Sequence, residues 1–256
     1  MNDQLKVYAP FDRTLIGTLP MADVDELEQK IATAHDLFQD RDQWIPAYKR
    51  IAILEKARAL MEDKIEDLTK IAAQEGGKPY QDSMVEVKRA INGLKIATEE
   101  ISHMKGGQIP MGITESSINR LAFTIREPIG VVASLSAFNH PLNLIVHQVI
   151  TAFAAGCPVI VKPASKTPYS CMALVEILKE AGVPEGWVQS IHCSNELSEK
   201  LVGDPRINFL SFIGSAKVGW SLKSKMAPGT RCALEHGGAA PVIVEKDSPF
   251  EEMLPL

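Results

Sequence analysis

Apolar residues recur at helical spacing over residues 24–103. The first amphipathic stretch follows Asp23, a residue type that caps helix N-termini. A second stretch covers residues 46–77 and ends at a Gly-Gly pair, and a third covers residues 82–104. We expect three helices with apolar faces packed in a core. On the first two helices these faces comprise Leu27, Ile31, Ala34 and Phe38, then Ile51, Leu54, Ala57, Leu60 and Met61.

The helical pattern is interrupted by a segment, residues 105–127, that has glycine and proline near its ends. Apolar and polar residues alternate from Asn119 to Arg126, which predicts a strand outside the core. Such a strand exposes unpaired backbone groups that can pair with another chain. We therefore expect an arm that contacts a second subunit.

From Ile129 onward, short apolar strands alternate with helices. This alternation predicts an α/β fold, with a five-stranded parallel sheet, helices on both faces, and a ligand at the carboxyl ends of the strands. A further strand is expected to begin at residues 241–244. The five predicted sheet strands are residues 129–135, 157–163, 187–193, 207–214 and 231–235, and the helices between them are residues 142–156, 169–182, 196–204 and 215–227.

Composition narrows the function classes. The chain has 256 residues, 45% of them hydrophobic and 23% charged, with a net charge of −5. Acids and bases are interspersed, so we expect no nucleic-acid partner. The apolar runs are too short to span a bilayer and the N-terminus is polar, which favours a cytoplasmic protein without a membrane partner. The four cysteines and six histidines lack ligand spacing, so no metal site is expected.

Polar residues stand where the predicted strands end. Gly214 and Ser215 lead from a strand into a helix whose free N–H groups suit a phosphate, although an ordinary strand-to-helix turn has the same pattern. Lys162 could donate to ribose or phosphate, or be solvated. Asn139 could cap the next helix, its commoner role, or donate to an oxyanion. Each motif alone is weak.

Glu235 stands at the end of an apolar strand, just before Gly237 and Gly238. A carboxylate there is unfavourable unless it is paired or functional. The two glycines allow a sharp turn and a close approach of the backbone to a bulky group.

Together these motifs resemble the aldehyde dehydrogenase superfamily. The segments AFNHPL, VIVKPASKTP, FIGSAKVG and LEHGG occur in the family's order, with REPIGVV before them and AGVPEGWV between them. The resemblance implies that Glu235 is the general base that activates the hydrolytic water, and that Asn139 is the side-chain half of the oxyanion hole. It also implies cofactor-binding roles for Ala137, Phe138, Lys162, Ala164, Ser165, Gly214, Ser215, Ala216, Lys217, Val218, Gly219, His236 and Gly237.

The family reaction is the NAD(P)-dependent oxidation of a small aldehyde to a carboxylic acid through a thioacyl-enzyme. The resemblance implies an N-terminal helical part over residues 1–104, the arm, a Rossmann-like NAD(P)-binding core over residues 128–236, and the start of a catalytic domain over residues 237–256. It also implies a homodimer or homotetramer. The family's nucleophilic cysteine would lie beyond Leu256, so we expect the 256-residue chain to be the cofactor-binding half and inactive alone.

Three departures from the family pattern bear on the site. Ser165 replaces a glutamate that grips the ribose diol in many relatives, and with Lys166 beside it this favours acceptance of NADP as well as NAD. Phe138 and His140 replace other aromatic residues near the substrate. His236 replaces a leucine whose role is carried by its backbone, so we expect this change to have little effect.

Two other functions remain open from the residues alone. One is a dinucleotide-binding or assembly module without enzymatic activity. The other is a different nicotinamide dehydrogenase, although the full GxGxxG motif and its downstream acid are missing.

Overall fold

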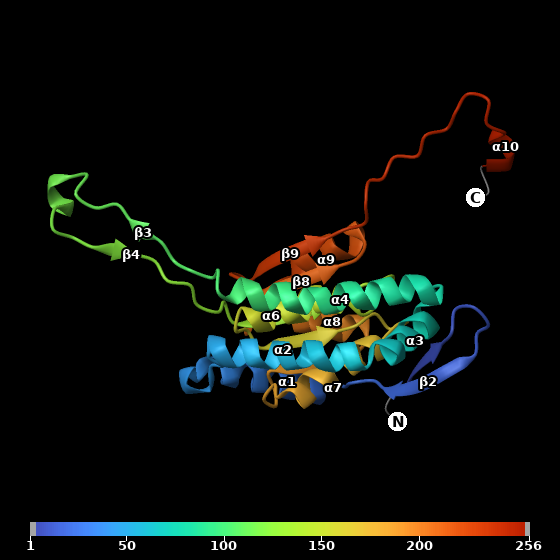
Figure 1. Ribbon diagram of the computed structural model, residues 1–256, viewed down its shortest axis with the longest axis horizontal. Coiled ribbons are helices and arrows are strands. Elements are labelled where there is room, and N and C mark those ends of the chain that lie inside the picture. The colour runs from blue at the N-terminus through green and yellow to red at the C-terminus, as the bar shows by residue number, and fades with distance from the viewer. Residues whose placement is uncertain (1–3, 254–256) are drawn as a thin grey trace.

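A five-stranded parallel sheet forms the centre of the computed structural model, which describes residues 4–253 (Figure 1). The strand order is β7-β6-β5-β8-β9, and all four neighbouring pairs are parallel. The predicted α/β fold is therefore confirmed. The strands are β5 (Val131–Leu135), β6 (Val159–Lys162), β7 (Val188–Ser190), β8 (Ile207–Ile213) and β9 (Arg231–Glu235).

The winding direction reverses at β5. From β5 the chain proceeds outward to β6 and β7, then returns to the other side of β5 for β8 and β9. At such a reversal the connections leave in opposite directions and open a crevice at the carboxyl ends of the strands. All five residues of β5 are buried, as expected for a central strand covered on both faces.

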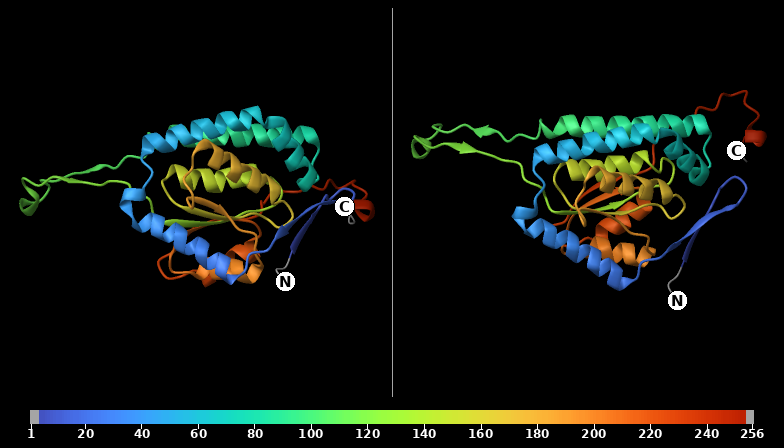
Figure 2. Two further views of the ribbon diagram at one scale, coloured as in Figure 1. Left: turned by 90° about the horizontal axis from the view of Figure 1, so that it is seen from below. Right: turned by 60° about the horizontal axis from the view of Figure 1, so that its bottom comes forward.

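Helices cover both faces of the sheet (Figure 2). Val132 of β5 joins the core on one face, and its neighbours Val131 and Ala133 join the core on the other. The first face carries α2 (Ala47–Asp63), α3 (Ile65–Gly76), α4 (Tyr80–Ile101), α7 (Tyr169–Ala181) and a helical run of α5 (Asn143–Ile145), the π-helical η3 (Val146–Ile150) and α6 (Thr151–Ala154). The second face carries α1 (Val24–Gln39), α8 (Asn195–Gly203) and α9 (Ala216–Lys225).

The predicted helix starts and stops are partly confirmed. Asp23 caps α1, its side chain accepting from the N–H of Glu26 at 2.9 Å. Gly77 and Gly182 end α3 and α7 in the left-handed conformation, which a residue without a Cβ adopts easily. The single helix predicted over residues 46–76 is divided at Lys64, which leaves the helical conformation between α2 and α3. Short helices also form at η1 (Arg41–Gln43) and α10 (Phe250–Met253).

The N-terminal residues form a hairpin that the sequence pattern did not predict. Strand β1 (Gln4–Tyr8) pairs antiparallel with β2 (Leu15–Pro20). The hairpin rests on α7, since a Cβ on Gly17 would lie 2.3 Å from the hydroxyl of Tyr169. Neither strand has a clean two-residue alternation, because the hairpin buries few of its side chains.

The arm extends away from the body, outside the core as expected (Figure 1). Its two strands are short: β3 (Gln108–Ile109) pairs antiparallel with β4 (Ala122–Phe123), and a 3₁₀ turn η2 (Glu115–Ser117) lies between them. The strand predicted over residues 119–126 therefore shrinks to two residues. Asn119 has a positive φ of 64° and lies outside the strand.

The C-terminal end of the sheet differs from the prediction in two ways. Strand β9 is an edge strand whose residues alternate between exposed and half-buried, so Glu235 does not follow a buried strand. The strand expected at residues 241–244 is not formed, and Val242 and Ile243 are 86% and 82% exposed. The reason is that no strand of the described chain lies beside them.

Two buried glutamates join the N-terminal helices to the sheet layer. Glu75 of α3 accepts from the N–H groups of Tyr169 and Ser170 at 2.7 and 2.8 Å, at the start of α7. Glu86 of α4 accepts from Leu142 and Asn143 at 2.9 and 3.2 Å, at the start of α5. Each carboxylate satisfies N–H groups that have no partner within their helix, and each lies where the helix dipole favours negative charge.

Glu75 makes stability depend on pH. Burial raises its pKa to about 7, against the opposing effect of its hydrogen bonds with Ser170 and Tyr169. Because the folded chain holds the proton more tightly than the unfolded chain, this contribution to stability is complete below about pH 4.5 and is lost as the pH rises through 7. We expect the unfolding free energy of the wild type, relative to that of Glu75→Gln, to fall by up to about 3 kcal/mol between pH 5 and pH 8.

Urea unfolding of both proteins at several pH values measures this difference. The paired comparison is needed because burial lowers the pKa of His192, which acts in the opposite direction over a neighbouring pH range. A difference that stays constant with pH would contradict the role of Glu75.

Candidate functional site

The parallel strands bring the predicted site residues to one edge of the sheet. Lys162 ends β6, Asn139 follows β5, and Gly214 follows β8. Glu235 ends β9, where its carbonyl accepts from the N–H of Gly214 at 3.0 Å. Residues from four distant segments thus share the carboxyl edge, as the sequence predicted.

A cleft of about 290 Å³ opens at this edge between α8 and α9. Its floor is formed by the ends of β5, β6 and β8, so it lies at the reversal of the winding direction. Three residues expected to bind cofactor line it: Lys162, Lys217 and Val218. The remaining lining residues are Leu135, Ser136, Asn195, Ser198, Glu199, Phe212, Ser221 and Leu222.

Lys162 is the charged group nearest the centre of the sheet in this cleft. Burial lowers the pKa of its ammonium group, and within residues 4–253 that group has neither an ion-pair partner nor a side-chain hydrogen bond. Lys162 is half-buried, and partial removal of an unpaired cation from water is unfavourable. The cost is removed by a ligand that brings hydroxyl or phosphate oxygens, as the ribose and pyrophosphate of a dinucleotide do.

The start of α9 is built for a group that approaches closely. The Ser215 hydroxyl accepts from the N–H of Val218 at 3.4 Å and caps the helix. Gly219 is buried, and a Cβ there would lie 2.3 Å from Nε2 of His236 and 3.0 Å from the Phe212 ring. A Cβ on Gly214 would lie 2.6 Å from the same ring. A Cβ at either position would have to displace the Phe212 or His236 ring, and a glycine turn that leads into a helix suits a dinucleotide phosphate.

His236 has a larger structural role than its backbone alone. Its ring packs edge-on against Trp220 and Phe212, with centroid distances of 5.3 and 6.4 Å. This contact attaches the end of β9 to α9. The expectation that the change from leucine has little effect overlooked this packing, because the partners lie on other elements.

Ser165 and Lys166 lie in a different cleft, of about 470 Å³, between the loop after β6 and the N-terminal hairpin. The Lys166 ammonium lies 5.4 Å from the centre of the Phe138 ring, a cation–π contact. Phe138 and Ser165 thus share this cleft, while Lys162 lines the other. The remaining predicted residues of this region are Ala137, just before Phe138, and Ala164, just before Ser165. Both are half-buried.

The two predicted catalytic residues are open to solvent. Glu235 lies exposed on the edge strand, and Asn139 lies exposed before α5. Gly237 and Ala216 are also exposed. The semi-apolar setting expected around Glu235 is therefore absent from the described chain, because β9 has no covering layer beyond it.

The cysteines do not supply a nucleophile at this edge. Burial raises the pKa of Cys157, Cys171 and Cys193, which keeps these thiols protonated. Cys232 is half-buried within β9 and packs against the core. Among residues 4–253 no group of three or more histidine, cysteine or acidic side chains could hold a metal ion, and no helix is long and apolar enough to cross a membrane.

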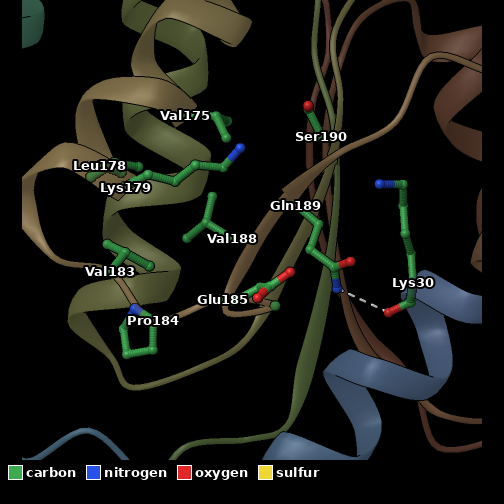
Figure 3. A pocket seen from close by; sticks show the side chains of 11 residues that line it. Lys30, Val175, Leu178, Lys179, Val183, Pro184, Glu185, Val188, Gln189 and Ser190 are labelled. Atoms are coloured by element: carbon green, nitrogen blue, oxygen red, sulfur yellow. Dashed lines mark hydrogen bonds between the residues drawn. The ribbon is translucent and has the colours of Figure 1, made fainter. Parts of the chain in front are cut away.

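Another hollow, of about 480 Å³, lies at the free edge of β7 and is separate from these residues (Figure 3). The side chain of Gln189 donates to the carbonyl of Lys30 at 3.0 Å, which joins β7 to α1 at this edge. None of the predicted site residues lines it.

A family model described as the aldehyde dehydrogenase family matches residues 1–255. The chain belongs to the aldehyde dehydrogenase family. It is 34% identical to the 3-sulfolactaldehyde dehydrogenase of Priestia megaterium, over 98% of this chain and 52% of that protein. It is also 34% identical to the lactaldehyde dehydrogenase of Methanocaldococcus jannaschii, over 98% of this chain and 54% of that protein. The chain therefore spans about half the length of the curated relatives it matches.

Solved structures of the family agree with the fold. Aldehyde dehydrogenase 21 of Physcomitrella patens, in complex with its reaction product succinate, superposes with a TM-score of 0.89 at 32% identity, covering 94% of this chain and 50% of that one. An NADP complex of glyceraldehyde-3-phosphate dehydrogenase from Methanocaldococcus jannaschii gives 0.85 at 33% identity, covering 93% and 51%.

Helix α8 contributes three lining residues to the cleft that the sequence pattern did not predict. Asn195, Ser198 and Glu199 line it from the side opposite α9. The position of α8 in the sequence could have predicted this contribution, since the helix begins shortly after strand β7 and is capped by Ser194. A helix that begins at the carboxyl edge of this sheet borders the same crevice.

Replacing Lys162 should change dinucleotide affinity and the free energy of unfolding differently in this aldehyde dehydrogenase chain. In Lys162→Met we expect dinucleotide affinity to fall about 10- to 100-fold, because a charge-assisted contact is lost. We expect the unfolding free energy to stay equal or to rise, because a half-buried cation without an ion-pair partner is removed. Calorimetric titration with NADP⁺ and urea unfolding measure the two effects, with the solvent-exposed Lys223→Met as the control. Loss of stability together with binding would indicate a structural role for Lys162.

Proposed function

We propose that this aldehyde dehydrogenase chain binds NAD(P)⁺ for the oxidation of an aldehyde to a carboxylic acid through a thioacyl-enzyme in the complete protein. The observation that carries the proposal is the half-buried ammonium of Lys162, which has no ion-pair partner in the described chain, in a cleft at the winding reversal. The relatives named above are aldehyde dehydrogenases, and one solved relative holds NADP.

The residues of the cleft suit a dinucleotide. Lys162 would donate to the adenosine ribose, and the first turn of α9, capped by Ser215, would face the pyrophosphate. The glycines at 214 and 219 allow that backbone to approach. When bound, the cofactor supplies the acceptor for the hydride that leaves the substrate.

Asn139 and Glu235 divide the remaining chemistry. The amide of Asn139 would donate to the oxygen that becomes negative when a thiolate attacks the aldehyde carbon. Glu235 would then take a proton from the water that cleaves the thioester. Both side chains are exposed at the edge where the cleft opens, so both are free to meet a substrate there.

In the complete protein, Glu235→Gln separates acylation from hydrolysis. We expect one turnover of NAD(P)H to form at nearly the wild-type rate, because the first half of the reaction does not need the base. Steady-state turnover should fall by about 10²-fold or more, because glutamine cannot take a proton from water. Stopped-flow absorbance of the reduced cofactor measures both phases.

If Glu235→Gln also abolished the first turnover of reduced cofactor, Glu235 would have a different role. The 256-residue chain is the matched control: we expect it to bind cofactor and to form no reduced cofactor from aldehydes, since three of its thiols are buried and Cys232 packs against the core.

We also propose that the protein accepts NADP at least as well as NAD. Solved relatives include NADP complexes and an NAD-dependent benzaldehyde dehydrogenase from Corynebacterium glutamicum, so the family fold serves both cofactors. Ser165 places no carboxylate that would repel a 2′-phosphate. Lys166 contacts the Phe138 ring, so its charge adds less than an inward-facing lysine would.

Ser165→Glu tests this preference. We expect NADP⁺ affinity to fall about tenfold or more, through repulsion of the 2′-phosphate, while NAD⁺ affinity stays equal or rises. Titration calorimetry with both cofactors measures the change, and Ser165→Gln controls for side-chain size without charge. Tight NAD⁺ binding with no NADP⁺ binding in the wild type would show that Ser165 does not set the preference.

We further propose that the protein acts in the cytoplasm as a homodimer or homotetramer. The arm supports this assembly, because it extends away from the body and exposes Ile113, Leu121 and Ile125. Large apolar side chains gathered on an extended element favour a second subunit over water.

A further inference from the structure

The N-terminal hairpin forms one wall of the cleft that contains Ser165, called the hairpin cleft below. This wall includes Lys6 and Arg13, and the loop after β6 contributes Ser165 and Lys166 to the opposite wall. The cleft has a volume of about 470 Å³. Three cationic side chains from two segments far apart in the sequence therefore border one cleft.

The charge of the hairpin wall is not neutralised within the fold. Lys6 and Arg13 form no ion pair within residues 4–253, whereas Arg206 pairs with Glu28 at 2.6 Å. Glu75 is the one acidic side chain that lines the cleft in the described structure. Its two oxygens accept from N–H groups at the start of α7, so its charge is directed toward that helix. The hairpin wall therefore presents uncompensated positive charge to the cleft.

The hairpin is held against the body of the molecule, which fixes the position of these cations. Pro10 packs on the end of α3, since a Cβ on Gly77 would lie 3.0 Å from the Cβ of Pro10. Arg13 has a positive φ of 63°, and its N–H donates to the carbonyl of Ala9 at 3.0 Å. A residue other than glycine seldom adopts this conformation. The turn thus places Arg13 at a defined point beside the cleft.

The hairpin cleft adjoins the cleft at Lys162 along two chain segments. Ser136 and Lys162 line the cleft at Lys162, and Phe138 and Ser165, a few residues later on the same two segments, line the hairpin cleft. The segments lie side by side, because the N–H of Ser136 donates to the carbonyl of Lys162 at 3.1 Å. Three residues of extended chain span at most about 11 Å. A nucleoside held at Lys162 can therefore reach the hairpin cleft with a phosphate.

We propose that the hairpin cleft is a phosphate site formed by Lys6 and Arg13, and that its ligand is the 2′-phosphate of NADP⁺. The inference rests on the proposed function, with the adenosine ribose at Lys162. The guanidinium of Arg13 can hold two phosphate oxygens at once, and the ammonium of Lys6 adds a second charge-assisted contact. Ser165 borders the same cleft without charge. Cofactor choice then depends on the N-terminal hairpin as well as on the loop after β6.

The test compares the two cofactors in the complete protein, since they differ only in the 2′-phosphate. For Lys6→Met/Arg13→Met we expect the Kd for NADP⁺ to rise about 10- to 100-fold and the Kd for NAD⁺ to change less than about threefold. Titration calorimetry measures both values. Methionine keeps a long side chain at each position, and unchanged NAD⁺ binding reports that the fold is intact.

Two controls accompany this variant. Lys70→Met removes a cation from α3 that does not line the cleft, and it should leave both Kd values unchanged. Arg13→Lys keeps the charge, and it should retain most of the affinity for NADP⁺. An unchanged Kd for NADP⁺ in the double variant, or an equal loss for both cofactors, would overturn the inference. Binding of NAD⁺ without NADP⁺ by the wild type would also overturn it.

A measurement with inorganic phosphate keeps the cleft testable if the complete protein binds neither cofactor, a result that would remove the proposed function. Phosphate is then titrated into the protein while the ¹H–¹⁵N resonance of the Arg13 side chain is followed. We expect a saturable shift that Lys6→Met weakens several-fold and Lys70→Met leaves unchanged. Absence of a saturable shift overturns the assignment of the cleft as a phosphate site.

Discussion

The loops of the site depend on two buried carboxylates from elsewhere in the chain. Glu75 and Glu86 come from the N-terminal helices, and each is 1% exposed. Glu75 holds the start of α7, directly after the loop that contains Ser165. Glu86 holds the start of α5, directly after the loop that contains Asn139. Without them, four N–H groups in the protein interior would lack an acceptor, at about 1–3 kcal/mol each. The N-terminal helices therefore position the loops of the sheet.

Glu86 and Lys162 differ in how their charges are compensated. Glu86 contacts the ammonium of Lys78 as well as its two N–H donors, so its charge is compensated within the fold. Lys162 has no such compensation in the described chain. A buried charge that is paired within the fold helps to hold two segments together. A charge withdrawn from water without a partner is unfavourable, and a ligand that brings oxygen atoms can compensate it. This contrast separates the framework of the molecule from its binding cleft.

The fold was predictable from local patterns because its sheet follows them. The strand β5 is buried on both faces, and the strands β6, β7 and β8 are each followed by an amphipathic helix. Parallel strands then bring Lys162 and Glu235 to one edge without any knowledge of side-chain contacts. Family resemblance added the expected roles, which the residue patterns alone left open.

The features that escaped prediction depend on contacts between distant segments. Glu75 lies 94 residues from Tyr169, and Glu86 lies 56 residues from Leu142, so a helical pattern does not distinguish them from surface glutamates. The family resemblance implies a backbone role for His236, and its ring contacts with Trp220 and Phe212 join residues that are not its immediate sequence neighbours. The exposure of β9 results from its position at the edge of the sheet. The sequence did not predict it, because an apolar segment looks the same whether its strand is central or at an edge.

The residues of the candidate site differ in how far the described chain encloses them. The cleft at Lys162 is lined by β-strand ends, α8 and α9, all from this chain, and Lys162 is half-buried in it. Glu235 and Asn139 remain exposed. Electrostatic contacts strengthen when water is excluded. The described chain therefore forms the cleft at Lys162 by itself, whereas Glu235 and Asn139 lie where its own residues do not cover them.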